Sequence, residues 1–251
     1  MAGHSKWANI KHKKGKADAA RGKVFSKISK EIIVAASLGG GNLDDNIQLR
    51  ALVQKAKSVS MPKDNIDRAI KKGTGELEGG RLEEGSYEGY AAGGIAVVVK
   101  VLTDNKNRSA AAVRHAFTKA GANMAEHGAV SRIFQRKGQI FIDKNQVDED
   151  MLMEIVINAG AEDFKTDGEK FEVITDPADF DVVSDSIIQA SINMEVSEIS
   201  MIPELVNEIS DIDQAKSIMK FIEALEEIDD VQDVYSNFDI SYEVAAILDK
   251  E

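Results

Sequence analysis

Residues 138–202 contain six predicted secondary-structure elements in succession, and this succession constrains the fold more than any other feature. Runs of apolar and β-branched residues predict strands at 139–142, 163–166, 170–174 and 195–201. Apolar residues at helical spacing predict helices around 151–156 and 180–187. Asp167 and Gly168, between the second and third strands, are typical of a β-hairpin turn. The order β-α-β-β-α-β predicts a ferredoxin-like domain.

The segments on either side of this unit are incomplete by themselves. A β-branched run predicts a buried strand at 95–102, followed by a helix at 107–121 and a strand at 130–134. The later segment provides only one helix, at 211–227, and one strand, at 231–238. One helix and one strand cannot enclose a hydrophobic core. We therefore predict that both segments form one split sheet, into which the ferredoxin-like unit is inserted.

The N-terminal part of the chain has the pattern of a small helical unit. Apolar residues at steps of three and four predict three helices between residues 17 and 73. The glycines at 39–41 end the first helix, Asp44 or Asp45 caps the second, and Pro62 begins the third. Residues 73–85 are rich in glycine and acids, which predicts a linker.

The predicted fold class is α+β and multidomain, with an N-terminal three-helix domain plus two ferredoxin-like α/β domains, one inserted in the other. The predicted parts are a flexible basic arm at 1–16, a helical domain at 17–78, a split α/β domain at 79–136 and 204–240, an inserted ferredoxin-like domain at 137–203 and a C-terminal tail at 241–251.

Charge is distributed very unevenly along the chain. Residues 1–30 hold nine Lys and Arg against one Asp, whereas residues 81–251 hold 15 basic against 35 acidic residues. The net charge of -12 therefore combines a cationic N-terminus with an acidic body. Such an arrangement indicates a polyanion partner for the N-terminus. A tail that served only solubility would have no need of a charge opposite to that of the rest of the protein.

Composition excludes several classes of protein. No apolar run approaches the ~18 residues of a membrane span, and the first 15 residues are too polar for a signal core. The absence of cysteine excludes disulfides, thiolate nucleophiles and cysteine-based metal sites. We expect a cytoplasmic protein without a membrane partner.

The arm contains the predicted nucleic-acid site. Lysines attract phosphates, and Trp7, the only tryptophan, either stacks on an unpaired base or packs on the helical unit. The predicted nucleic-acid-binding residues are Lys6, Trp7, Lys11, His12, Lys13, Lys14, Lys16, Arg21, Lys23 and Lys27.

A second cationic surface is predicted on two later helices, with a merely solvated face as the alternative. Three of its members, at steps of seven and four on the 107–121 helix, share a face roughly opposite Val113, and Asn105 or Asn107 is expected to cap that helix. The predicted members are Lys63, Arg68, Lys71, Lys72, Arg108, His115 and Lys119.

No catalytic, metal or cofactor site is predicted. Asp104 follows a buried strand, but no second acid, nucleophile or oriented base accompanies it. His4 and His12 have only Asp18 near them in sequence, too few ligands for a metal. The glycine-rich stretches at 39–41 and 93–94 lack the lysine and the strand-to-helix order of phosphate-binding loops. No small-molecule substrate is identified.

Several longer motifs resemble the YebC/PmpR family, which includes mitochondrial translational activators of a cytochrome oxidase subunit. The matching segments are MAGHSKWANIKHKK at the start, the GK-x-F-x-K segment at 22–27, MPKDNI-x-RAIKKGTGE at 61–76, YEGY at 87–90, LTDN-x-NR at 102–108 and VRH-x-F at 113–117. One departure is Gly89-Tyr-Ala-Ala-Gly-Gly, where the family usually has Gly-Tyr-Gly-Pro-Gly-Gly.

The resemblance implies three domains, with one α/β domain interrupting the other, and a regulator of gene expression. Family members are described as transcriptional regulators that bind promoter DNA, which is the leading interpretation here. Others resemble translation factors acting on the ribosome, and a short lysine arm with one aromatic also suits irregular RNA. The third interpretation is a small-molecule sensor or an enzyme on the ferredoxin-like domains.

Overall fold

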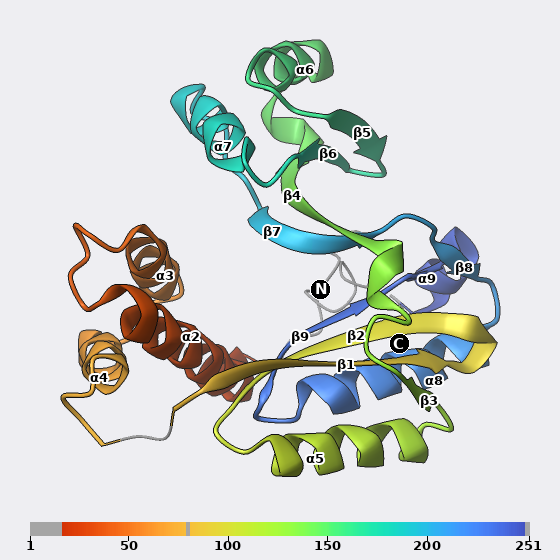
Figure 1. Cartoon of the computed structure of the whole chain (residues 1–251). Coiled ribbons are helices and arrows are strands. Elements are labelled where there is room, and N and C mark those ends of the chain that lie inside the picture. Colours follow the sequence, from red (N-terminus) through yellow and green to blue (C-terminus); the bar gives the residue numbers. More distant parts are fainter. Residues whose placement is uncertain (1–16, 79–80, 249–251) are drawn as a thin grey trace. The chain divides into compact units, whose positions relative to one another are not determined.

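A computed structural model describes residues 17–78 and 81–248 of the chain, which divide into two compact units. Of the described residues, one unit contains those up to His127 together with Ile212–Val234, and the other contains Gly128–Asp211 together with those from Tyr235 to residue 248. Figure 1 shows the elements of both. None of the helices in these described ranges is long and apolar enough to cross a membrane.

Three helices form the N-terminal domain of the first unit: α2 (Ala17–Gly39), α3 (Ile47–Ser58) and α4 (Lys63–Gly73). Gly40 follows α2 with a φ of 80°, the left-handed conformation that favours glycine after a helix end. The core contains the predicted stripes, with Ile32, Leu49, Val53 and Ile66 among its buried residues.

The cap of α3 differs from the prediction. Asn46, and neither Asp44 nor Asp45, accepts the hydrogen bond from the Leu49 amide, at 3.0 Å. The Asn46 amide also donates to carbonyl oxygens of Ala35 and Gly40, each at 2.9 Å. A carboxylate cannot donate, so only an amide side chain joins the end of α2 to the start of α3 in this way.

The split sheet has the strand order β3-β1-β2-β9. Its elements in chain order are β1 (Glu83–Ala91), β2 (Ile95–Thr103), α5 (Lys106–Lys119) and β3 (Asn123–Ala125), followed after a long interval by α8 (Ile212–Glu226) and β9 (Val231–Ser236). A single 3-10 turn, Ala92–Gly94, joins β1 to β2. The chain therefore leaves this sheet after β3 and returns with β9.

Both helices of the split domain pack on the same face of its sheet (Figure 1). Their contact includes Phe117 of α5 and Phe221 of α8, whose rings meet edge to face with centroids 4.9 Å apart. Gly89 of β1 lies against α5. A Cβ at this position would collide with the Phe117 ring of α5 and with the Asn123 carbonyl oxygen. The opposite face of β1 and β2 carries no helix of this domain.

In the second unit, a four-stranded antiparallel sheet has the order β5-β6-β4-β7. The elements are β4 (Phe134–Asp143), α6 (Glu149–Asn158), β5 (Asp163–Asp167), β6 (Lys170–Thr175), α7 (Phe180–Gln189) and β7 (Val196–Pro203). Ile140, Leu152, Val173 and Ile187 are fully buried in its core. A further 3-10 turn, Lys144–Gln146, precedes α6.

The predicted fold class is confirmed: α+β and multidomain, with a three-helix domain and two α/β domains, one inserted within the other. The predicted domain boundaries stay predictions. The strand predicted at 130–134 is wrong, since Ser131–Ile133 forms a 3-10 turn before β4. The apolar residues at 130, 133 and 134 are spaced as in a turn, and β3 is the edge strand instead.

Three short elements follow the inserted domain in the second unit. β8 (Asn207–Ile209) and β10 (Phe238–Ile240) pair in parallel. Helix α9 (Tyr242–Leu248) buries Val244 and Leu248, in the segment for which the sequence predicted a tail.

Candidate nucleic-acid interface and its anchor

The predicted arm residues lie mostly outside the described residues. This applies to Lys6, Trp7, Lys11, His12, Lys13, Lys14 and Lys16, whereas Arg21 falls within α2. The phosphate-binding role of these residues therefore rests on the sequence. The structure describes the next part of the basic segment, which is helix α2.

Lys23 and Lys27, which the sequence assigned to phosphate contacts, bind groups of this chain. Lys23 forms an ion pair with Glu227, just after α8. Lys27 Nζ donates to the backbone carbonyl of Gln232 on β9, at 2.8 Å. Together with Lys30 they occupy positions i, i+4 and i+7 of α2, which share one helix face. This face fastens α2 to the split α/β domain.

Lys30 connects α2 to a nearly enclosed carboxylate. Lys30 Nζ lies 3.1 Å from Asp230 Oδ1 and also donates to the carbonyl oxygens of Asp229, at 2.8 Å, and Leu102, at 3.2 Å. Only 18% of the Lys30 side chain and 7% of the Asp230 side chain are exposed. All three ammonium donors thus have partners, as a partly buried lysine requires.

The Asp230 cluster consists of Asp230, Lys30, Arg108, Ser109 and Thr103. Arg108 Nη2 lies 2.8 Å from each Asp230 oxygen, and Ser109 Oγ donates to Asp230 Oδ2 at 2.8 Å. Ser109 Oγ and Thr103 Oγ1 are also 2.8 Å apart. Burial raises the pKa of Asp230, but hydrogen bonds from Arg108, Ser109 and Lys30 outweigh it and lower that pKa to about 2. Asp230 is therefore ionised at neutral pH.

Arg108 binds carboxylates of this chain, so its charge contributes little to the cationic face predicted on α5. Besides Asp230, its guanidinium contacts Asp104 Oδ1 at 2.9 Å. Hydrogen bonds with Asp230 and Asp104 raise the pKa of Arg108. Of the two caps predicted for this helix, Asn105 and Asn107, the structure has Asn105, whose side chain accepts from the Arg108 amide at 3.0 Å. The cap and the cluster together fix the start of α5.

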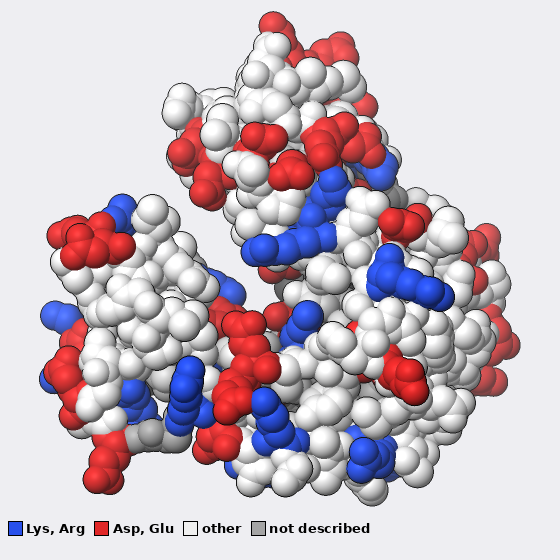
Figure 2. Space-filling model, viewed as in Figure 1, with Lys and Arg blue, Asp and Glu red and all other residues white. Residues whose placement is uncertain are grey.

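The other members of the predicted second surface are exposed. His115 and Lys119 lie on α5, and Lys63, Arg68, Lys71 and Lys72 lie on α4; within the described ranges, none of these six forms an ion pair. On the face seen in Figure 2, basic side chains are interspersed with acidic ones. Asp64 and Asp67 share the exposed side of α4, so its positive charge is partly offset.

Sequence reasoning missed Asp230, Lys30, Ser109 and Thr103. Asp230 lies in an acidic stretch, 226–233, that resembles an ordinary solvated segment. Its partner Arg108 is 122 positions away, and only the return of the chain to the split sheet brings the two together. The available signal was the prediction that the later segment completes the sheet begun by the earlier one, but that prediction does not say which strands pair.

These features define a multidomain α+β protein whose basic N-terminal helix is anchored by ion pairs to a split α/β domain. The chain belongs to the TACO1/YebC family. The family model for the TACO1/YebC N-terminal domain matches residues 5–76, and the model for the second and third domains matches residues 82–238.

Similar proteins cover almost the whole chain. A probable transcriptional regulatory protein of Desulforapulum autotrophicum is 53% identical over 244 residues, covering 97% of this chain and 98% of that protein. One from Natranaerobius thermophilus is 53% identical over 243 residues, covering 96% and 97%. The crystal structure of a conserved hypothetical protein from Aquifex aeolicus has a TM-score of 0.83 at 47% identity, covering 94% of this chain and 98% of that one.

Proposed function

We propose that this chain is a cytoplasmic regulator of gene expression that binds nucleic acid, with promoter DNA as its leading partner and transcription as the regulated process. The observation that carries the proposal is the division of charge between a cationic N-terminus and an acidic body. The names of the similar proteins from Desulforapulum autotrophicum and Natranaerobius thermophilus support the same process.

The proposed interface is centred on the basic residues that precede the anchor. Lys23, Lys27 and Lys30 have partners within this chain, which leaves six cations before them for phosphates: Lys6, Lys11, Lys13, Lys14, Lys16 and Arg21. The anchor supports this role because it fixes the helix from which the basic segment extends. Lys63, Arg68, Lys71 and Lys72 on α4 are proposed as a supplementary surface, with His115 and Lys119 on α5.

Crosslinking in cells, followed by sequencing of the bound DNA and RNA, tests this proposal. A transcriptional regulator should enrich a limited set of promoter segments, and the enrichment should fall when Lys11, Lys13 and Lys14 are replaced by Gln. A matched control replaces Lys57, Arg132 and Lys220 by Gln, which removes the same charge at exposed positions outside both proposed surfaces. Recovery of ribosomal or messenger RNA without promoter DNA would contradict the transcriptional assignment.

A translation factor that binds RNA or the ribosome is the second candidate, and Trp7 is the feature that favours it. Bases in a duplex are already stacked, so an aromatic side chain reaches their faces only by separating them. Splayed bases in RNA are accessible, and stacking on one contributes about 1–3 kcal/mol. Trp7→Ala should then weaken RNA or ribosome binding about ten- to a hundredfold and leave duplex binding nearly unchanged.

The fluorescence of Trp7 provides a second measurement, because Trp7 is the only tryptophan of the chain. Base stacking quenches indole fluorescence, whereas phosphate contacts by neighbouring lysines change it little. Quenching by ribosomes but not by promoter DNA supports the translation factor. Sequence-selective promoter binding that survives Trp7→Ala, without ribosome association, contradicts it.

A further inference from the structure

The two helices of the inserted domain combine exposed apolar side chains with charge of a single sign. Helices α6 and α7 contain five acids and no Lys, Arg or His. Their exposed large apolar side chains are each 51–59% accessible: Met151, Ile157, Val182 and Ile188. Figure 2 shows acidic and uncharged side chains over these helices. A helix that only covers a sheet has a polar outer side, so the apolar residues here call for a closer placement.

The contact of α6 with an edge strand shows which of its flanks faces α7. Glu149 Oε1 accepts a hydrogen bond from Thr166 Oγ1 of β5 at 2.8 Å, and β5 is one edge of the sheet. Ile157 lies on the same flank as Glu149. Met151 follows Glu149 by two positions, which is about 200° around a helix, and Ile155 is one turn further on. Met151 and Ile155 therefore lie on the flank away from β5.

The corresponding contact of α7 is with the other edge strand. Ser184 Oγ and Ser197 Oγ of β7 lie 3.3 Å apart. Ile188 shares the flank of Ser184, whereas Val182 and Ser186 lie nearly opposite it. Because α6 and α7 contact each other between the two edges, the flanks away from β5 and β7 face one another. The side chains of α6 and α7 thus place an apolar strip along the line where the two helices meet.

Acidic side chains line both sides of this strip. Each lies two positions from a buried core residue, Leu152 of α6 or Val183 of α7, and so points away from the sheet. Within the described ranges none of them forms an ion pair: Asp150, Glu154, Asp181 and Asp185. Each helix thus carries a like-charged pair at i and i+4, which disfavours the helix by itself. A partner of opposite charge would relieve this repulsion.

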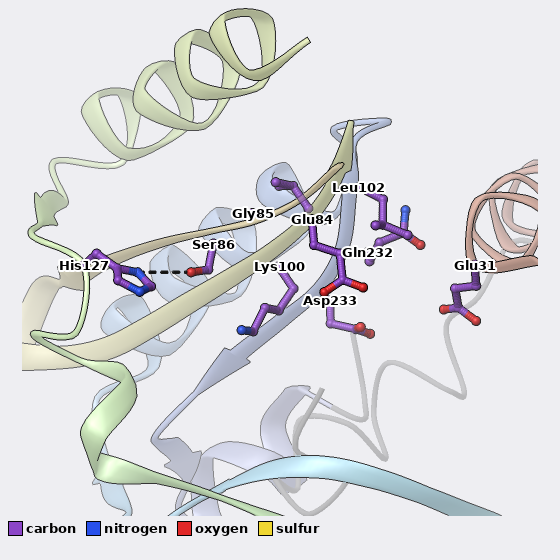
Figure 3. Close-up of a pocket in the computed structure, with 10 residues that line it drawn as sticks. Glu31, Glu84, Gly85, Ser86, Lys100, Leu102, His127, Gln232 and Asp233 are labelled. Atoms are coloured by element: carbon purple, nitrogen blue, oxygen red, sulfur yellow. Dashed lines mark hydrogen bonds between the residues drawn. The ribbon is translucent and has the colours of Figure 1, made fainter. Parts of the chain in front are cut away.

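The pocket on the helix-free face of the split sheet lacks this combination. Its volume is about 600 Å³, and its charged side chains are of both signs, with Lys100 beside Glu84 and Asp233 (Figure 3). His127 Nδ1 and Ser86 Oγ, joined by the dashed line, lie 3.3 Å apart. None of its lining residues is an exposed large apolar one.

We propose that the outer side of α6 and α7 binds a basic amphipathic helix of a partner protein. We name this surface the α6–α7 face; it consists of Met151, Ile155, Val182, Asp150, Glu154, Asp181 and Asp185. The apolar side of the partner helix packs on the strip, and its lysines or arginines bind the carboxylates on either side. Methionine at position 151 adapts to apolar partners of different shape. Each helix of the face has 10 residues, about 15 Å, enough for three turns of a docked helix.

The charge of the α6–α7 face disfavours other occupants. Nucleic acids and anionic membranes carry the same sign and are repelled. A second copy of this chain, bound across a two-fold axis, would bring acids against acids. The face lies outside the proposed nucleic-acid interface, and its proposed role does not depend on that interface.

Nuclear magnetic resonance of the ¹⁵N-labelled full chain, titrated with acetyl-(Leu-Lys-Lys-Leu-Leu-Lys-Leu)₂-amide, tests the proposal. This peptide places its leucines on one side of a helix and its lysines on the other. We expect saturable shifts of the backbone signals of α6 and α7, with a Kd of about 100 μM or tighter. The signals of α5 and α8 should stay in place.

Substitutions at exposed positions separate the apolar from the charged contribution. Met151→Gln combined with Val182→Thr should weaken binding about tenfold or more, because it removes apolar contacts and keeps every charge. Glu154→Gln combined with Asp185→Asn should weaken it about three- to tenfold. The effect of this second pair should disappear in about 1 M NaCl, where exposed charges are screened.

Matched controls remove the same groups elsewhere. Leu38→Gln combined with Ile47→Thr changes two exposed apolar side chains of the helical domain, and Glu223→Gln combined with Asp213→Asn removes two exposed charges from α8. Both double variants should leave the Kd unchanged. Two peptide controls replace every Leu by Ser, which should weaken binding at least tenfold, or every Lys by Glu, which should abolish it.

The proposal is overturned if the lysine peptide causes no saturable shift at about 1 mM, or if its shifts spread over acidic residues outside α6 and α7. Equal weakening by the control variants, or equal binding of the glutamate peptide, also overturns it. Sedimentation velocity examines the chain without peptide. A dimer that dissociates in the Met151→Gln, Val182→Thr variant would assign the face to a second copy and contradict the partner helix.

Discussion

Asp230 is a charged side chain held almost entirely out of water, and its ionisation is coupled to folding. Its pKa is lowered from an ordinary value of 3.8 to about 2, because Arg108, Ser109 and Lys30 outweigh the effect of burial. A lowered pKa stabilises the fold above about pH 4, and this contribution is lost as the pH falls towards 2. By linkage, the lowered pKa of Asp230 corresponds to about 2 kcal/mol in the free energy of unfolding.

Urea unfolding between pH 2 and pH 6 measures this contribution. Asp230→Asn should lose about 2–3 kcal/mol at pH 6, since it leaves Lys30 and Arg108 without their shared carboxylate. The difference from the unaltered protein should shrink as the pH is lowered from about 4 to 2. Asp229→Asn changes an exposed neighbour and should have little effect at any pH. A constant difference across the whole range would contradict the linkage argument.

The residues of the Asp230 cluster illustrate how far the sequence predicts individual contacts. The capping role of Asn105 could be predicted, because a cap acts within three residues of chain. The binding of Arg108 to Asp230 could not be predicted, since strand pairing between distant segments brings the two residues together. Lys23 and Lys27 were assigned to phosphates for the same reason: their charge is visible in the sequence, but the carbonyl and carboxylate opposite them are not.

At the scale of elements, two asparagine caps differ in the number of helices to which their side chains bind. Asn105 lies on the surface and caps only α5, whereas Asn46 is 7% exposed and joins the start of α3 to the end of α2. Asn46→Ala removes the cap and leaves the carbonyl oxygens of Ala35 and Gly40 without their side-chain donor. We expect it to cost about 2–3 kcal/mol, against about 1 kcal/mol for Asn105→Ala.

Thermal or urea denaturation of the two variants checks this order, and Asn46→Asp separates the two functions of the cap. Aspartate keeps the acceptor for the Leu49 amide but loses the donor and places a charge near two carbonyl oxygens. It should therefore be about as unstable as the alanine variant. If Asn46→Asp retains full stability, the donor contacts to the end of α2 carry little energy.

Helices were easier to predict than strands in this chain, for a physical reason. Each helix has apolar residues at helical spacing and a local start or stop signal. β1 has neither, because its sequence EEGSYEGYA carries polar residues on one face and glycines on the other. Glu88 is 1% exposed within this strand, an environment that only the fold provides. The predicted linker therefore extended to Gly85 and included the first three residues of β1.

At the scale of the whole molecule, the insertion can be tested by excision. Phe134, at the start of β4, pairs with Pro203, at the end of β7, so the two ends of the inserted domain lie within one strand spacing of each other. Replacing residues 135–202 by Asn-Gly should leave a protein that unfolds cooperatively and retains the Phe117–Phe221 contact.

Circular dichroism and calorimetry of the shortened chain provide the measurement. The excised domain, produced separately as residues 134–203, should fold independently, because its core draws on no residue beyond these limits. The nested architecture would be contradicted by a shortened chain that stays unfolded while a chain ending at residue 136 folds.

The opposite charges of the two parts of the molecule give a quantitative prediction for nucleic-acid binding. If Lys6, Lys11, Lys13, Lys14, Lys16 and Arg21 each neutralise one phosphate, log K against log[salt] should have a slope of about -5 for duplex DNA and about -4 for single strands. Fluorescence anisotropy of labelled nucleic acid across salt concentrations measures the slope. Lys14→Gln should reduce its magnitude by about 1, whereas Lys27→Gln should leave it unchanged, because Lys27 already binds the Gln232 carbonyl. A slope near -7, or an equal effect of the two substitutions, would place Lys27 on the phosphates and contradict its role in the anchor.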